Sequence, residues 1–154
     1  MFDQALILRN METLRRPYGS FIAAPSPDYS AIWIRDHLYM VFAYYYLGPK
    51  YYDQLISGIQ VVFNIFHKHR HKLERISHPE DTTQGLIVHE LIHAKYNPDT
   101  LDEITNDWGH HQLDAIGLFL HIVADLDFKH IQVVRDKGDR EILGLLVFYL
   151  QNVQ

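Results

Sequence analysis

Two segments of this chain, residues 35–47 and 112–126, are apolar or aromatic on nearly every side of a helix, and they constrain the fold more than any other feature. A helix without a polar face is stable only when it is buried on every side. Residues 3–14, 50–71 and 139–152 instead carry apolar side chains three and four positions apart, which predicts one-sided helices. The five helices predict an all-α fold, in which stacked helical hairpins place a buried inner layer against an amphipathic outer layer.

The segments between these helices carry the signals of connectors. Residues 21–29 contain two prolines, which predicts an extended, irregular segment. Residues 77–85 are polar and predict a loop, whereas residues 84–96 are compatible with either a strand or a helix. The basic run at 67–72 follows the long amphipathic pattern, so we expect a solvated helix end that the helix dipole stabilises.

Composition and charge exclude several classes of function. The formal net charge is −5, and a nucleic-acid partner is not expected, because phosphate binding depends on clustered Lys and Arg. The chain contains no cysteine, which excludes disulfides and thiolate chemistry. The longest apolar stretches, 40–47 and 142–150, are shorter than the ~20 residues that a membrane span needs. No signal peptide is recognisable, so we expect a cytoplasmic protein that does not bind membranes.

One short motif suggests metal chemistry. His89, Glu90 and His93 match the His-Glu-x-x-His pattern, in which two zinc ligands and a general base share one face of a helix. The surrounding segment is rich in Leu, Ile and Val, which favours a short strand, and there the two histidines would be roughly 13 Å apart. Only Asp114 is loosely suitable as a third ligand. We therefore expect no metal and no other cofactor, and a zinc metallopeptidase remains a weak alternative.

A stronger signal precedes the first of the two apolar helices. Trp33, Arg35 and Asp36 place an aromatic ring, a guanidinium and a carboxylate at the helix start, where free backbone N–H groups also face outward. A pyranose offers a flat C–H face for stacking and hydroxyls that accept from Arg and donate to Asp. The three side chains are therefore candidates to hold one sugar unit. The alternative is a helix cap with an ion pair.

A second cluster, residues 107–114, precedes the other apolar helix and again combines aromatic and polar side chains. Clusters at equivalent ends of two inner helices would line one cavity. In order and spacing, Trp33–Asp36, His93–Asn97 and Trp108–Asp114 resemble glycoside hydrolase family 15. The similarity is greatest to the glucoamylase-like part of phosphorylase kinase regulatory subunits and their bacterial relatives, whose pattern Leu146–Tyr149 also fits. It extends from about residue 18 to the end of the chain.

The resemblance implies an (α/α)6 toroid, in which six inner helices surround a funnel and six outer helices support them. Residues 1–154 then form the N-terminal portion of a glucoamylase-like (α/α)6 domain. This portion is a partial toroid with about the first five helices of its inner and outer hairpins, and we expect the chain to be truncated.

The resemblance also implies an activity and a set of site residues. Members of the family release glucose, with inversion, from the non-reducing ends of α-glucosides such as starch oligosaccharides, dextrans and trehalose. In this interpretation Arg35 and Asp36 hold the glucosyl hydroxyls, and Trp33 shapes the same subsite. Lys95 and Trp108 contact the substrate or position the catalytic acid.

The catalytic pair itself is not recognisable. An inverting hydrolase needs a protonated carboxylic acid and a carboxylate base about 6.5–9.5 Å apart. The resemblance places both on glutamates of later motifs, and Glu90, Glu103 and Glu141 are interpreted as ordinary solvated carboxylates. We therefore expect a chain that contributes sugar-contacting residues to an inverting hydrolase and is inactive alone. The alternative is a non-catalytic carbohydrate-binding or regulatory module.

The sequence departs from the glucoamylase pattern at two places, with His110 where the pattern has Arg, and Ala115 and Ile116 where it has Gly-Pro. The kinase-subunit version tolerates both changes, so the substrate range stays open. A portion of a toroid exposes the faces between its helices. We expect an α-glucan or α-glucoside as ligand, and association with the rest of the toroid or with another chain.

Overall fold

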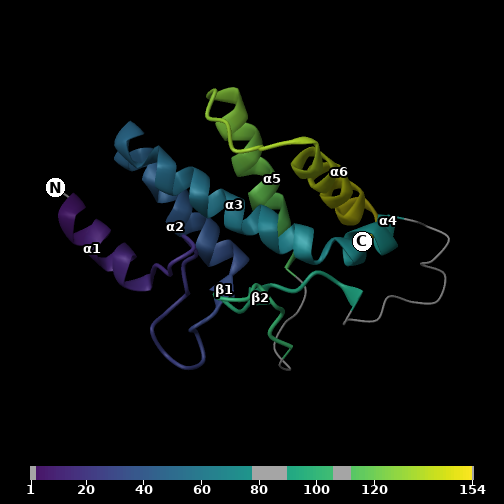
Figure 1. Cartoon of the computed structure of the whole chain (residues 1–154), viewed down its shortest axis with the longest axis horizontal. Helices are drawn as coiled ribbons and strands as arrows, with labels where there is room; N and C mark the ends of the chain where they lie inside the picture. The colour runs from purple at the N-terminus through teal and green to yellow at the C-terminus, as the bar shows by residue number, and fades with distance from the viewer. Residues whose placement is uncertain (1–2, 78–89, 106–111, 154) are drawn as a thin grey trace.

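The computed structural model describes residues 3–77, 90–105 and 112–153. These residues form six α-helices, one short 3-10 helix and a two-stranded antiparallel ribbon (Figure 1). In chain order the elements are α1 (Gln4–Leu14), β1 (Ile32–Trp33), α2 (Ile34–Leu47), η1 (Pro49–Tyr51), α3 (Tyr52–Lys68), α4 (Arg70–Ser77), β2 (Lys95–Tyr96), α5 (Leu113–Phe128) and α6 (Lys137–Asn152). The predicted all-α class is confirmed. Of the helices described, none combines the length and apolarity needed to cross a membrane.

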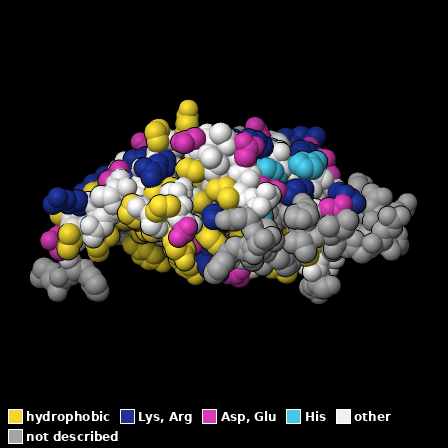
Figure 2. All heavy atoms as spheres, turned by 90° about the horizontal axis from the view of Figure 1, so that it is seen from below, with side chains coloured by type: hydrophobic (Ala, Val, Ile, Leu, Met, Phe, Trp, Pro, Cys, Tyr) yellow, Lys and Arg dark blue, Asp and Glu magenta, His cyan; other side chains and the backbone are white. Residues whose placement is uncertain are grey.

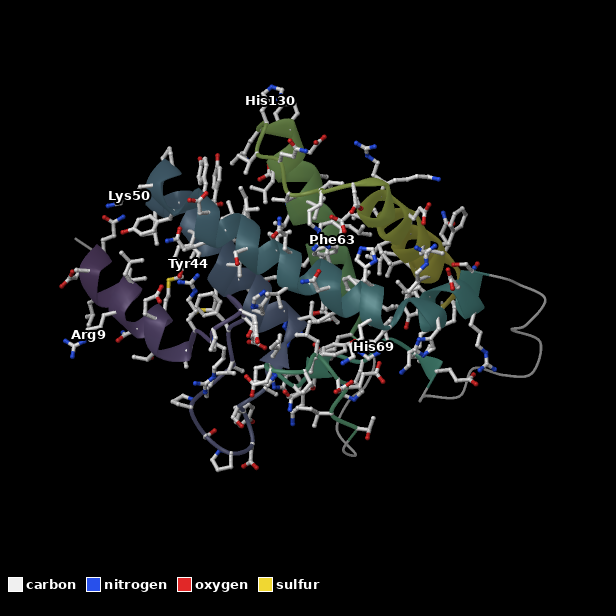
Figure 3. The ribbon with its side chains drawn as sticks, viewed as in Figure 1. Arg9, Tyr44, Lys50, Phe63, His69 and His130 are labelled. Atoms are coloured by element: carbon white, nitrogen blue, oxygen red, sulfur yellow. The ribbon has the colours of Figure 1, made fainter. Side chains whose placement is uncertain are left out.

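The helices pack side by side on one side of the molecule, and the β1–β2 ribbon with its connecting segments lies below them in Figure 1. The core lies between α2, α3, α5 and α6. Phe63 and Phe66 of α3 meet Phe119 of α5 with ring centroids 5.0 and 5.3 Å apart, and Figure 3 shows Phe63 between α3 and α5. All three rings are fully buried, so these contacts remove large apolar surfaces from water.

Helices α2 and α3 form a hairpin and approach each other closely at Gly58 and Val41. Gly48 ends α2 with a positive φ of 100°, a conformation that costs glycine little. Farther along α3, a Cβ on Gly58 would stand only 2.8 Å from one methyl carbon of Val41. His37, fully buried on α2, donates from Nε2 to the carbonyl of Gly58 (2.9 Å) and accepts the N–H of Phe21 at Nδ1 (3.0 Å). The histidine therefore joins three segments through one neutral ring.

Helix α1 is capped at its N-terminus and attached to α2 near its C-terminus. Asp3 caps its N-terminus by accepting the N–H groups of Ala5 and Leu6. Near its C-terminal end, Glu12 accepts the buried hydroxyl of Tyr44 at 2.8 Å, which ties α1 to α2. In Figure 3 the Tyr44 side chain points from α2 toward α1. Burial, and then the bond to Glu12, raise the pKa of Tyr44 well above its usual value.

The helix predicted over residues 50–71 is present as α3 (Tyr52–Lys68), but its predicted end is wrong, because the chain breaks at His69 and continues as α4. The N–H of His69 still bonds to the carbonyl of Ile65 at 3.0 Å, but its φ of −104° and ψ of 20° leave the helical region. Its side chain donates from Nε2 to the carbonyl of Leu101 at 2.9 Å, and Figure 3 shows it directed at the segment below α3. A contact with a segment distant in sequence thus fixes the break.

The basic run at 67–72 is not a solvated helix end. His67 donates to the buried carboxylate of Asp139 at 2.8 Å. Lys72 lies 2.5 Å from Glu103, and both side chains are only 12% exposed. The run therefore joins α3 and α4 to α6 and to the 90–105 segment, so tertiary ion pairs replace the expected interaction with solvent.

Helices α2 and α5, whose sequences are apolar on nearly every side, are not buried on every side. Tyr39 and Tyr46 of α2 are 60% and 76% exposed, and Phe128 at the end of α5 is 83% exposed. Figure 2 shows hydrophobic side chains gathered at the surface on the ribbon side of the molecule. The expectation of burial on every side is therefore not met within the described residues, and apolar faces of both helices stay open.

Candidate functional site

The ribbon brings together two predicted site residues that lie far apart in the sequence. Trp33 on β1 pairs with Lys95 on β2, and the N–H of Ile34 bonds to the carbonyl of Ala94 at 3.1 Å. The Lys95 ammonium lies 5.6 Å from the centroid of the Trp33 ring, a cation–π arrangement. Both residues are buried, at 9% and 7% exposure. The segment 84–96, which the sequence left open between strand and helix, thus contains a strand at its end.

Two pockets share the Trp33 side chain. One of about 400 Å³ is lined by Asp28, Tyr29, Ser30, Trp33 and Lys95, with Pro27, Ala31 and Ile104 completing it. The other, of about 360 Å³, is lined by Ala23, Tyr29, Trp33, Arg35 and Asp36. Tyr29 lines both and is 48% exposed. The indole therefore stands between a lysine-containing pocket and a pocket with an arginine and an aspartate.

Arg35 connects the starts of the two all-round apolar helices. Its Nη1 lies 2.7 Å from Oδ2 of Asp114, in the first turn of α5. Both side chains are partly exposed, at 39% and 58%, so the pair contributes little stability but orients the guanidinium. The hydrogen bond to Asp114 raises the pKa of Arg35 above its usual value. The first turns of α2 and α5 therefore lie together, which is the arrangement that a shared cavity requires.

Asp36 lies exposed in the first turn of α2, where the helix dipole favours a negative charge. The indole N–H of Trp33, by contrast, is buried and has no hydrogen-bond partner within the described part of the chain. A buried donor without a partner is unfavourable. The site thus combines an accessible carboxylate, an oriented guanidinium, a buried lysine and a buried indole N–H.

The structure brings four of the five predicted site residues together, namely Trp33, Arg35, Asp36 and Lys95. Trp108 lies outside the described residues. Sequence reasoning missed Tyr29, which lines both pockets, and the polar side chains of Asp28 and Ser30 beside it. The only available signal was their place directly before the Trp33 motif, in a proline-containing segment that we expected to serve as a connector.

None of the three glutamates considered for catalysis lines these pockets. Glu103 is paired with Lys72, and both side chains are only 12% exposed. The interpretation of Glu103 as a solvated carboxylate is therefore wrong. Glu90 pairs with Arg75, and Glu141 with Arg70 at 3.0 Å. Hydrogen bonds and charge from Arg70 lower the pKa of Glu141, which is the opposite of what a general acid needs.

The described half of the zinc motif lacks the helical geometry that the motif needs. Residues 90–94 contain no α-helix, and His93 accepts the backbone N–H of Lys95 at Nδ1 (2.9 Å). His89 lies outside the described residues. Across residues 3–77, 90–105 and 112–153, no group of three or more potential metal-ligating side chains occurs.

Comparison with known proteins places these features in a family. The profile of glycosyl hydrolases family 15 matches residues 3–153. Similar proteins include the liver isoform of phosphorylase b kinase regulatory subunit alpha from Takifugu rubripes (25% identity over 77% of this chain) and from Mus musculus (24% over 95%). The skeletal muscle isoform from Oryctolagus cuniculus is 26% identical over 82% of the chain. The chain spans only 11% to 13% of the length of these relatives.

Proposed function

Because this chain belongs to glycosyl hydrolases family 15, we propose that it provides one glucosyl-binding subsite of a glucoamylase-like domain and does not hydrolyse glycosides by itself. The helices form part of a helical toroid. The ligand is the non-reducing end of an α-linked glucoside, such as a starch oligosaccharide, dextran or trehalose. The observation that carries this proposal is the grouping of Trp33, Lys95, Arg35 and Asp36 around two adjoining pockets.

The chemistry of these side chains fits a sugar better than an apolar or anionic ligand. Tyr29 and Trp33 offer aromatic surface for the C–H face of a pyranose, and Arg35 with Asp36 offers a donor and an acceptor to neighbouring hydroxyls. Asp28 and Asp36 balance the positive charges of Lys95 and Arg35 in the two pockets, which suits a neutral ligand better than an anion. A volume of about 400 Å³ lies within the range of small-ligand sites.

Hydrolysis needs a second arrangement that the described residues do not supply. An inverting mechanism places an acid and a base about 6.5–9.5 Å apart on opposite sides of the scissile bond, and the acid must carry a proton near neutral pH. Glu90, Glu103 and Glu141 are committed to cations elsewhere in the fold. We therefore propose that catalytic glutamates, where a protein with this subsite has them, belong to further parts of the toroid.

A regulatory, non-catalytic role is the second candidate. The relatives named above are regulatory subunits of a kinase, and the open apolar faces at Tyr39, Tyr46 and Phe128 suit association with further protein surface. We propose that the rest of a toroid or another chain covers these faces. In that case the chain would bind glucan at the Trp33 pockets and serve to detect it, without hydrolysing it.

The test compares two aspartates in equivalent positions. Asp36 and Asp53 are both exposed and lie in the first turns of α2 and α3, so replacing either with Ala removes the same helix-dipole interaction. The chain is titrated with maltose and with trehalose while backbone amide shifts are followed by NMR. We expect a dissociation constant on the order of 1 mM. Asp36→Ala weakens it about tenfold, because a hydrogen bond to a charged group is lost, and Asp53→Ala leaves it unchanged.

Two results would contradict this proposal. Equal binding by the Asp36→Ala and Asp53→Ala proteins would remove Asp36 from the subsite. Glucose release from maltose or trehalose by the unmodified chain, abolished by Asp36→Ala, would show that the chain is a hydrolase in its own right.

A further inference from the structure

We propose that the chain has a second ligand site, a crevice on α3 that binds a neutral, hydroxyl-rich ligand of the α-glucan class. The α3 crevice has a volume of about 300 Å³ and is lined by Tyr18, Ser57, Gln60, Asn64, Asp99 and Thr100, with Val61 and Leu101 completing the lining. It shares no lining residue with the two Trp33 pockets. The choice of an α-glucan rests on the proposed function, whereas the site itself rests on its own geometry.

The first wall is a tight turn that lies directly on α3. The N–H of Gly19 bonds to the carbonyl of Arg16 at 2.9 Å, and the N–H of Arg16 bonds to Ser20 at 2.8 Å. Gly19 has a φ of 84°, and a Cβ there would lie 2.7 Å from Oγ of Ser57 on α3. The left-handed backbone at this position therefore favours glycine. The turn presents Tyr18 with 71% of its surface exposed.

The opposite wall is a second fixed turn. Oδ1 of Asn97 accepts the N–H groups of Asp99 and Thr100 at 2.9 and 3.0 Å, an Asx turn. Leu101 has a positive φ of 60°, which is costly for a leucine and persists only where the surroundings hold it. Here its carbonyl accepts Nε2 of His69 at 2.9 Å. The wall is thus formed before any ligand arrives, which reduces the entropy lost on binding.

The floor is one polar face of α3. Ser57, Gln60 and Asn64 recur three and four positions apart, so they lie in a row along the helix. Oδ1 of Asn64 accepts Nη1 of Arg135 at 2.7 Å, which leaves the NH2 group of the amide as a donor. Asp99 on the facing turn is an exposed acceptor. The crevice therefore offers donors and acceptors on a rigid frame beside an exposed aromatic ring.

These properties select among classes of ligand. The lining contains one carboxylate and no Lys or Arg. Lys68 and Arg135, which bond to Thr100 and Asn64 of the lining, are each also paired with an aspartate, so the crevice is poorly suited to a phosphate or another anion. Six of the eight lining residues carry a polar group beside apolar surface, a mixture that suits an amphipathic ligand better than a wholly apolar peptide helix. A glucosyl unit matches each feature, because its C–H face stacks on a tyrosine and its hydroxyls both donate and accept. The crevice is thus suited to hold a second segment of glucan, away from the Trp33 pockets.

The test uses Tyr18→Ala, with Tyr46→Ala as the matched control, because both tyrosines are largely exposed (71% and 76%) and Tyr46 lies outside the crevice. The chain is titrated with maltotriose while backbone amide shifts are followed by NMR. We expect saturable shifts at residues 57–64 and 97–101, weakened about tenfold by Tyr18→Ala and unchanged by Tyr46→Ala. Asp36→Ala should leave them unchanged as well.

The outcomes separate this inference from the proposed function. Shifts confined to the Trp33 pockets, or crevice shifts that Tyr18→Ala and Tyr46→Ala affect equally, overturn the crevice site and leave the subsite intact. Shifts confined to the crevice overturn the subsite instead and support the crevice. No saturable shift at either place overturns both. Binding of inorganic phosphate at residues 57–64 in place of maltotriose would also overturn the assignment of a neutral ligand.

Discussion

Gly58 allows α2 and α3 to approach each other, and replacing it with Ala should destabilise the fold although alanine favours helices. The added Cβ would come closer than real Cβ contacts allow to both methyl carbons of Val41, 2.8 Å from the more distant one. The carbonyl of Gly58 also accepts a hydrogen bond from Nε2 of His37 at 2.9 Å, so moving the two helices apart would strain that bond. Val41 and His37 are fully buried, so neither side chain has a free volume to enter.

The magnitude follows from two opposing effects. Alanine in a helix interior is about 1 kcal/mol more favourable than glycine. Overpacking a close-packed interface costs about 1–3 kcal/mol, and a contact with a β-branched side chain in a fixed rotamer belongs near the upper limit. We therefore expect a net loss of about 2 kcal/mol for Gly58→Ala. Gly117 and Gly144 have no atom within 4 Å of an added Cβ, so alanine there should gain about 1 kcal/mol.

The assay is urea unfolding monitored by circular dichroism. The three glycine variants are compared with the same slope of unfolding free energy against urea concentration. A rescue tests the cause: Val41→Ala removes the methyl groups that clash, so the double variant with Gly58→Ala should be more stable than the sum of the single effects by about 1–2 kcal/mol. The steric explanation is refuted if Gly58→Ala stabilises the protein as Gly117→Ala does, or if the double-mutant cycle shows no coupling.

Three further predictions concern buried polar groups. Burial lowers the pKa of His37 to about 4. The free energy of unfolding should therefore be highest above pH 6.5 and should fall by on the order of 3 kcal/mol as the pH drops toward 4, because the unfolded chain binds the proton more tightly than the folded chain. Urea unfolding across this pH range measures the loss. Asp139→Ala should cost about 3 kcal/mol in urea unfolding, because it leaves Arg135 and His67 without their shared buried partner. Tyr149→Phe should cost about 1–3 kcal/mol in the same assay, because the buried N–H of Ile92 then loses its 3.0 Å bond to the phenol oxygen.

The helix break at His69 shows where the helical pattern stops being informative. Apolar residues continue at helical spacing from Phe66 through the break to Leu73 and Ile76, all of them buried, so periodicity alone predicts one helix. The break depends on the bond from His69 to Leu101, two residues that lie 32 positions apart. No local signal encodes a contact of that kind, and the sequence therefore predicted the existence of the helix but not its end.

The candidate site was likewise predictable only in part. The residue types of the Trp33 motif predicted either contact with a sugar or a helix cap with an ion pair, and the sugar contact stays a prediction. The participation of Tyr29 was not predictable, because its position depends on how the proline-containing segment turns: the N–H of Ala24 bonds to the carbonyl of Tyr29, and that of Ala23 to Ala31. A prediction from residue types therefore recovers the motif but not the wall opposite it.

The 90–105 segment connects α4 and α6 to the Trp33 pockets, so residues far from these pockets should affect them. Lys95 is fixed by the pairing with Trp33 on one side and by the bond from Ile104 N–H to its carbonyl on the other, at 3.1 Å. The same segment is attached to α6 through Tyr149 and to α4 through Lys72, which donates to the carbonyl of Leu91 at 3.1 Å. Loss of either attachment loosens the strand that carries Lys95. Helices α4 and α6 thus support the fold and also the strand whose lysine ammonium lies over the indole that both pockets share.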